Sequence, residues 1–282
     1  MDRQLDATER KALAQRISLA IDDYCATTYN DGHRNHLGAS IIGKECDMQL
    51  WATFRWFGSK PISGRMLRLF NRGHREEARF LEWLRGTGWT VYETDPETGK
   101  QFRISGVDGH YGGSCDGVGV HPEFGTFVIE MKTKGTGSGF TKLVSDGVAK
   151  QHPEHFGQMS TYGWKLGIPN GLYLSINKND DTIHCEVVEL DYALAERLEG
   201  RARDIIYAKA PPKRISASPT FYQCKWCDFA EPCHMGAKPE TNCRSCKNAE
   251  PVENAEWRCN LHGSVIPKEF LPVGCSEWES VI

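Results

Sequence analysis

Apolar positions along the chain alternate between helical and strand-like spacing. Leu13, Ile17 and Ile21 lie four residues apart, which predicts a helix over residues 1–28. Residues 64–85 predict a second, longer helix with apolar side chains on one face and a row of arginines on the other. Glu77 falls within that apolar face, where an unpaired carboxylate is costly. We therefore expect Glu77 to be paired or to bind a metal ion.

Strand-like runs follow the long helix. They cover residues 89–94, residues 101–105, a run that ends at residues 116–120, and residues 125–134, and turn-forming stretches separate them. This spacing fits an antiparallel meander. A helix over residues 153–166 comes next and starts near Pro153, and a hairpin over residues 172–190 follows it. The expected fold class is mixed α/β, with the element order αβββαβ.

Length and charge limit the location and the partners. The chain has 282 residues and a net charge of −3, so it is not a basic nucleic-acid coat, and any nucleic-acid contact must come from a local patch. No stretch approaches the ~20 apolar residues that span a bilayer. The N-terminus is charged and lacks the apolar segment of a signal peptide. We expect a cytoplasmic protein with no membrane partner.

Ionisable residues gather at the ends of two predicted strands. Asp116 ends one strand-like run, while Glu130 and Lys132 lie two residues apart on the next, so their side chains point to the same face. Two acids and a lysine brought together by a hairpin can hold a divalent cation and activate a water. A surface cluster of ion pairs is the alternative. Gln158 and Tyr162 lie four residues apart on one face of a helix, which alone indicates only packing.

With these residues in this order, the chain resembles the PD-(D/E)XK nuclease superfamily and, within it, the RecB-type branch. The four matching motifs are Gly73-x-x-x-Glu77, Gly113-x-x-Asp116, Glu130-x-Lys132 and Gln158-x-x-x-Tyr162. The resemblance covers residues 38–235 and extends to the iron–sulfur exonucleases associated with CRISPR adaptation and their phage-encoded relatives. Two departures stand out. RecB-type enzymes usually carry His at the position of Glu77, and no proline precedes Asp116.

The resemblance implies a restriction-endonuclease-like core and a role for each motif residue. The implied catalytic residues are Glu77, Asp116, Glu130, Lys132, Gln158 and Tyr162. The implied ligands of Mg²⁺ or Mn²⁺ are Glu77, Asp116, Glu130 and the backbone carbonyl of Met131. His74, one turn before Glu77, is the second choice for that position. Lys132 would orient the attacking water and stabilise negative charge, and Gln158 would orient the site.

Nucleic-acid contacts are expected from the arginine-rich face and from the aromatic of the last motif. The residues implied in DNA binding are Arg68, Arg72, Arg75 and Tyr162. A solvated helix face is the alternative interpretation of the arginine row.

The cysteines form two groups, and in a reducing compartment eleven cysteines favour metal ligation over disulfides. The motif Cys224-x2-Cys227-x5-Cys233 supplies three thiolates, and Cys46 is the candidate for the fourth. The iron–sulfur members of the resembling family use one N-terminal and three C-terminal cysteines, which implies a [4Fe–4S] cluster here. A zinc site with the same ligands, or with His234 in place of one, is the alternative.

The second group lies outside the resemblance. The spacing Cys243-x2-Cys246-x12-Cys259-x15-Cys275 predicts a structural Zn²⁺ site, with His262 as an alternative to either of the last two cysteines. About 40 residues are too few to hold together on an apolar core alone, so the metal would supply the stability. The expected regions are an N-terminal helix and linker over 1–37, a nuclease domain with its cluster over 38–236, and a zinc-binding module over 237–282.

The predicted activity is hydrolysis of DNA phosphodiester bonds by a Mg²⁺- or Mn²⁺-dependent exonuclease. The resemblance implies action on single-stranded DNA or DNA ends, in replication or recombination, with DNA as substrate and recombination or replication proteins as partners. Two alternatives stay open. One is a catalytically idle protein that binds DNA or recruits a partner, and the other is a structure-specific endonuclease.

Overall fold

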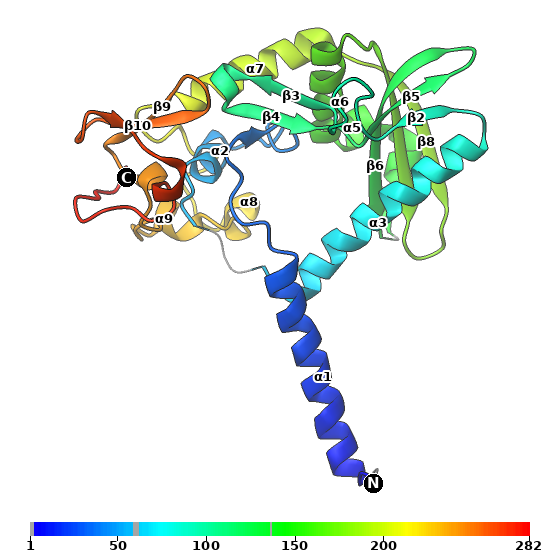
Figure 1. Ribbon diagram of the computed structural model, residues 1–282, viewed down its shortest axis with the longest axis horizontal. Helices are drawn as coiled ribbons and strands as arrows, with labels where there is room; N and C mark the ends of the chain where they lie inside the picture. Colours follow the sequence, from blue (N-terminus) through cyan, green and yellow to red (C-terminus); the bar gives the residue numbers. More distant parts are fainter. Residues whose placement is uncertain (1–2, 59–61, 136) are drawn as a thin grey trace.

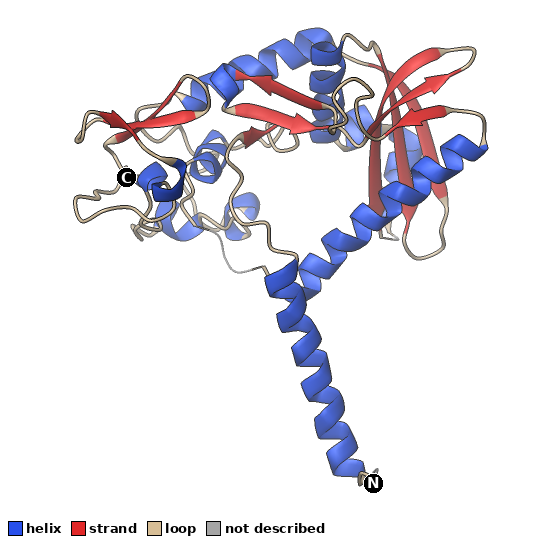
Figure 2. Ribbon diagram, in the orientation of Figure 1, coloured by secondary structure: helices blue, strands red, loops and turns tan. Residues whose placement is uncertain are grey.

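The computed structural model describes residues 3–58, 62–135 and 137–282. The body is mixed α/β, as predicted, and one helix extends away from it (Figures 1 and 2). The longer helices are α1 (Ala7–Thr28), α2 (Asp47–Phe54), α3 (Gly64–Gly86), α4 (Ser138–Asp146), α6 (Pro153–Leu166) and α7 (Tyr192–Ile206). The short ones are α5 (Val148–Gln151), α8 (Tyr222–Lys225) and α9 (Ala230–His234). Within the described part of the chain, no helix is both long and apolar enough to cross a membrane.

The main sheet has the strand order β2-β5-β6-β7-β8. Its strands are β2 (Thr90–Tyr92), β5 (Gly117–His121), β6 (Gly125–Lys134), β7 (Asn170–Asn177) and β8 (Ile183–Glu189). β6 and β7 pair in parallel, and the other neighbours pair antiparallel. A parallel pair needs a long crossover, and α4, α5 and α6 supply it. The order α3-β2-β5-β6-α6-β7 confirms the predicted αβββαβ core.

The predicted meander is wrong in one respect, because its second run leaves the main sheet. β3 (Arg103–Gly106) and β4 (Tyr111–Ser114) pair with each other, and β4 pairs in parallel with β1 (Leu37–Gly38). β2 therefore pairs directly with β5. The deciding partner, β1, lies more than 70 residues away in the chain, and local alternation carries no information about such a partner.

Alternate residues of β6 face two different layers. Phe127, Ile129 and Met131 pack in one cluster with Phe80 and Leu81 of α3. Val128, between them, packs on the opposite side in the cluster that contains Met159 and Tyr162 of α6. A strand alternates its side chains between faces, so Glu130 and Lys132 point the same way as Val128. This confirms the face predicted for the acid and the lysine.

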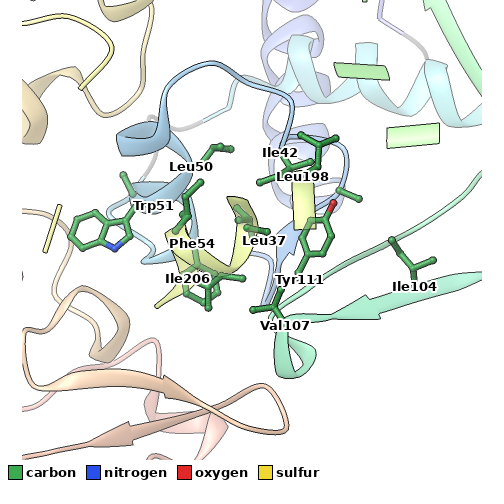
Figure 3. Packing of buried hydrophobic residues seen from close by; sticks show 14 of the residues in the cluster. Leu37, Ile42, Leu50, Trp51, Phe54, Ile104, Val107, Tyr111, Leu198 and Ile206 are labelled. Carbon is green, nitrogen blue, oxygen red and sulfur yellow. The ribbon is translucent and has the colours of Figure 1, made fainter. Parts of the chain in front are cut away.

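The larger core joins segments that are far apart in the sequence. Residues from α2, α7 and the β1-β4-β3 sheet interdigitate, including Trp51, Phe54, Tyr111 and Leu198 (Figure 3). Trp257, at 1% exposure, belongs to the same cluster and comes from the C-terminal sheet. That sheet consists of β9 (Ala249–Val252), β10 (Glu256–Cys259) and β11 (Ser264–Val265). The C-terminal segment thus shares its core with the rest of the protein.

Candidate active site

A cavity of about 730 Å³ opens between α3, the segment that follows α1, and the end of β6. Its lining includes Phe70, His74, Glu77, Met131 and Lys132. The amphipathic prediction for α3 is corrected here. Phe80 and Leu81 of the predicted apolar face are buried, together with Leu67, but Phe70, which was predicted on the same face, is 48% exposed.

Glu77 therefore faces a cavity and does not lie within an apolar core. The neighbouring acid, Glu76, is the buried one, and it pairs with Arg79 at 2.7 Å. Burial and the charge of Asp116 raise the pKa of Glu77, while His74 and Lys132 oppose the rise. Glu77 is thus close enough to Asp116 and Lys132 to feel both charges.

The acid and lysine of β6 contact each other, and Lys132 lines the cavity. Glu130 is fully buried, and one of its carboxylate oxygens accepts a hydrogen bond from Nζ of Lys132. The same Nζ donates to the carbonyl oxygen of Met131 at 3.2 Å. The backbone N–H of Met131 donates to Oδ2 of Asp116 at 2.8 Å. These contacts place two carboxylates, one backbone carbonyl and one ammonium at a single point.

Three carboxylates close to one lysine shift one another's pKa values. Burial raises the pKa of Glu130 to about 8, with Asp116 and Glu77 adding to the rise and Lys132 opposing it. Burial also raises the pKa of Asp116. Burial alone would lower the pKa of Lys132, but the three carboxylates raise it, so the amine stays charged. The donor set fits a divalent cation, since such an ion would relieve the repulsion among the carboxylates.

Gln158 and Tyr162 of α6 form the layer behind Glu130. Nε2 of Gln158 donates to the second carboxylate oxygen of Glu130 at 3.1 Å and lies 3.4 Å from the hydroxyl of Tyr162. A Cβ at Gly113 would stand 2.6 Å from that hydroxyl, so only glycine leaves room for it. The residues of the last motif therefore fix the orientation of the buried acid.

The predicted DNA-contacting residues lie in different surroundings. Tyr162 is only 2% exposed, so its assignment as a DNA contact is corrected to a supporting position. Arg68 pairs with Asp22 of α1, and Arg72 donates to the carbonyl oxygen of Lys178 at 3.4 Å. Arg75 is exposed. Arg72 and Arg75 thus remain the candidates for contacts with a substrate along α3.

One ionisable cluster was missed from the sequence. Among the described residues, only His152, Glu154 and His155 bring three possible metal-ligating atoms within 4.8 Å of one another. Nζ of Lys134 contacts Nε2 of His152, and the hydroxyl of Tyr173 contacts Nδ1 of His155 at 3.0 Å. The run His152-x-Glu154-His155, which ends three positions before Gln158, was the available signal.

The surroundings of this cluster favour a neutral imidazole at His155 over a bound cation. Burial, Lys132, His152 and Lys134 lower the pKa of His155 to about 3. The same positive charges would repel a divalent ion. The amine of Lys134 already contacts Nε2 of His152, so this nitrogen is not open to a metal ion. Lys132 and Lys134 of β6 therefore determine the electrostatic environment at the start of α6.

The first cysteine set converges across the fold. Cys46, at the N-cap of α2, lines a small cavity together with Cys224, Cys227 and Cys233. Burial raises the pKa of each of the three C-terminal thiols, and the charge of Cys46 adds to each rise. The chain thus brings four thiols together from segments about 180 residues apart, which is a suitable donor set for an iron–sulfur cluster or for zinc.

The second cysteine set surrounds a cavity of about 230 Å³. Cys243, Cys246, Cys259 and Cys275 line it together with His262. In the described part of the chain, no three of these sulfurs lie within 4.8 Å of one another. Four sulfurs that bind one zinc ion at about 2.3 Å lie closer to one another than these do. Binding of an ion would therefore need the sulfurs to move together.

Two buried guanidinium groups lie beside this second set. Nη1 of Arg55 donates to the carbonyl oxygens of Arg244, Cys246 and Ala249 at 3.1–3.4 Å. Arg244 is fully buried among aromatic rings, 4.3 Å from the centroid of Trp56 and 4.7 Å from that of Trp257. Nε of each arginine has no hydrogen-bond partner among the described residues. Burial lowers the pKa of Arg55 to about 10, and the nearby Cys246 and Glu250 oppose that shift.

Comparisons with known proteins were made for sequence and for backbone shape. No family model matches the chain, and no curated protein matches it. The crystal structure of SSO0001 superposes with a TM-score of 0.47 and 16% identity, covering 77% of this chain and 96% of that one. The alkaline exonuclease LHK-Exo from Laribacter hongkongensis superposes with a TM-score of 0.41 and 22% identity, covering 61% and 86%. LHK-Exo in complex with dAMP superposes with a TM-score of 0.42 and 21% identity, covering 65% of this chain and 89% of that one.

Proposed function

We propose that the protein is a metal-dependent deoxyribonuclease. One observation carries the proposal. Lys132 bridges the carboxylate of Glu130 and the carbonyl of Met131, whose N–H holds Asp116, and Glu77 lies close enough for its pKa to respond to Asp116 and Lys132. This arrangement gathers hard oxygen ligands and one fixed cation beside an open cleft that Glu77, Met131 and Lys132 line.

Each residue has a separate task in this proposal. Glu77, Asp116, Glu130 and the carbonyl of Met131 would hold Mg²⁺ or Mn²⁺, with His74 adjacent to Glu77 as the alternative ligand. The ion would lower the pKa of a bound water and polarise a phosphate. Lys132 holds its ammonium where it can orient that water and stabilise the charge that develops on the phosphate oxygens. Gln158 keeps Glu130 oriented, and Tyr162 supports Gln158 from behind.

The substrate class follows from the shape and charge of the cleft. A cavity of about 730 Å³ whose lining includes Arg34, Lys132 and Lys178 suits a polyanion more than a small neutral molecule. Exonucleolytic action on single strands or DNA ends, in replication or recombination, is our preferred mode.

The proposal is tested with end-labelled DNA. We expect hydrolysis in Mg²⁺ or Mn²⁺ and none in EDTA, because the carboxylates alone cannot activate a water. Single- and double-stranded substrates labelled at the 5′ or 3′ end would give strand preference and polarity. Circular single-stranded DNA serves as the control, since an exonuclease leaves it intact and an endonuclease cuts it. Binding of DNA without any hydrolysis in either metal would favour the idle-protein alternative.

We propose further that Cys46, Cys224, Cys227 and Cys233 hold a [4Fe–4S] cluster that ties the two ends of the nuclease fold together. Cys46 caps α2, and α2 packs into the large core, so a cluster there would anchor the C-terminal segment to it. Protein purified without oxygen should be brown, and Cys46→Ala should remove most of the visible absorption. Cys185→Ala is the matched control, because Cys185 is exposed on β8. Colourless wild-type protein with two zinc ions per chain would contradict the cluster.

The second cysteine set is proposed as a structural Zn²⁺ site. A zinc ion with four thiolates carries a net double negative charge, which two guanidinium groups would balance. The buried Arg55 and Arg244 lie in the right place for this, since Arg55 donates to the carbonyl of Cys246 itself. This charge balance supports a four-thiolate site over one in which His262 replaces a cysteine.

A further inference from the structure

α1 is a well-formed helix that touches the body only near its C-terminal end. Asp6 and Glu9 form a capping box at its start. Near its end, Asp22 pairs with Arg68 of α3, and Cys25 is buried. A Cβ at Gly64 would overlap the carbonyl oxygen of Asp22, so glycine permits the close approach of the two helices. The rest of α1 extends away from the body (Figure 1).

An apolar stripe runs along the extended part. Leu13, Ile17, Ile21 and Tyr24 are 36%, 51%, 49% and 61% exposed. Their spacing of four, four and three residues places them on one face of a helix at 100° per residue. Cys25 follows Ile21 by four residues and continues this row to the point where it is buried beside Arg68 of α3. An isolated helix with such a stripe is marginal in water, and exposed apolar stripes of this kind mark interaction surfaces.

The charges beside the stripe indicate what covers it. Arg16 and Asp23 are seven residues apart and so lie on the same flank of the stripe. Both are exposed, and no contact of either side chain with another described residue is found. If a second copy of the helix ran antiparallel, Arg16 of each copy would meet Asp23 of the other. In a parallel two-fold pair, the same flank of the two copies lies on opposite sides of the interface, so Arg16 and Asp23 would not meet.

We propose that α1 is a dimerisation helix that pairs with α1 of a second copy in antiparallel orientation. The apolar stripe supplies the contact, and the two symmetric Arg16–Asp23 pairs set the direction. A helix of 22 residues is about 33 Å long, so the two bodies stand at opposite ends of the pair. The segment directly after α1 lines the active-site cavity, so each dimer carries two separate clefts. This inference is independent of the proposed nuclease activity.

The interface is small, so we expect a dissociation constant of about micromolar order. Sedimentation equilibrium of the full chain over roughly 1–100 µM should show a monomer–dimer equilibrium. Ile17→Asp should abolish the dimer. Arg16→Asp and Asp23→Arg should each weaken it about tenfold, because each creates two repulsive pairs. The double variant Arg16→Asp with Asp23→Arg should restore wild-type dimerisation.

Lys11→Asp is the matched control, since it changes the charge by the same amount away from the stripe and should leave dimerisation unchanged. Far-UV circular dichroism of each variant checks that α1 and the body stay folded, and recovery in the double variant rules out a folding defect in the single ones. A monomer at every concentration would overturn the proposal and assign the stripe to a different protein. A dimer that tolerates Arg16→Asp, or a double variant that stays monomeric, would overturn the antiparallel arrangement.

Discussion

Lys132→Ala is expected to lower metal-dependent DNA hydrolysis by roughly 10²–10⁴-fold, the range that a positioned proton-transfer group or charge-stabilising donor supplies. Among the described residues, Lys132 is the one cation that contacts Glu130 directly, and it also touches the carbonyl of Met131. Without it, neither the attacking water nor the developing negative charge has a fixed partner. Single-turnover rates with end-labelled DNA at saturating Mn²⁺ measure the effect.

The fold should survive this substitution. The pKa of Glu130 is already raised to about 8, so the acid can take up a proton near neutral pH once its cation is removed. Gln158 also still contacts the other carboxylate oxygen. Lys142→Ala on α4 is the matched control, because Lys142 is exposed on the surface. If Lys132→Ala digests DNA at the wild-type rate while Lys142→Ala does too, the chemistry assigned to the cleft is wrong.

Arg55→Met should destabilise the whole protein by about 3 kcal/mol, because it leaves three buried carbonyl oxygens of the C-terminal segment without their donor. For a chain of this length, that loss corresponds to a melting temperature lower by roughly 5 °C. Methionine keeps most of the volume between the rings of Trp51 and Trp257, so a cavity is not the main cause. Urea unfolding followed by tryptophan fluorescence measures the change.

Arg258→Met is the control for this measurement, since Arg258 lies on β10 of the same segment with its side chain exposed. We expect it to change the free energy of unfolding by less than about 0.5 kcal/mol. The prediction also concerns how the segment is attached. If Arg55→Met unfolds residues 237–282 in a separate early transition, the segment depends on Arg55 for docking. Unchanged unfolding would show that the aromatic contacts of Arg244 and Trp257 suffice without Arg55.

Much of the site could be anticipated because its motifs are local. The two-residue spacing of Glu130 and Lys132 on a strand forces both to one face, and the four-residue spacing of Gln158 and Tyr162 does the same on a helix. Glu77 was harder. Its place within an apolar pattern predicted a buried acid, but the pattern cannot distinguish a side that packs on a sheet from a side that lines a cleft. Phe70 is exposed for the same reason.

Taken alone, the sequence determined the element order αβββαβ and the side of β6 that carries the acid and the lysine. These follow from periodicity and spacing, which act over a few residues. The two cysteine sets stay predictions, and Cys46 was assigned to the first of them through the family resemblance. Only the tertiary structure decided that β3 and β4 leave the main sheet, that Tyr162 is buried, and that the C-terminal segment shares the main core. It also left the apolar stripe of α1 uncovered. Each of these depends on contacts between segments distant in the chain. A local sequence pattern does not show which distant segment a strand or helix will contact.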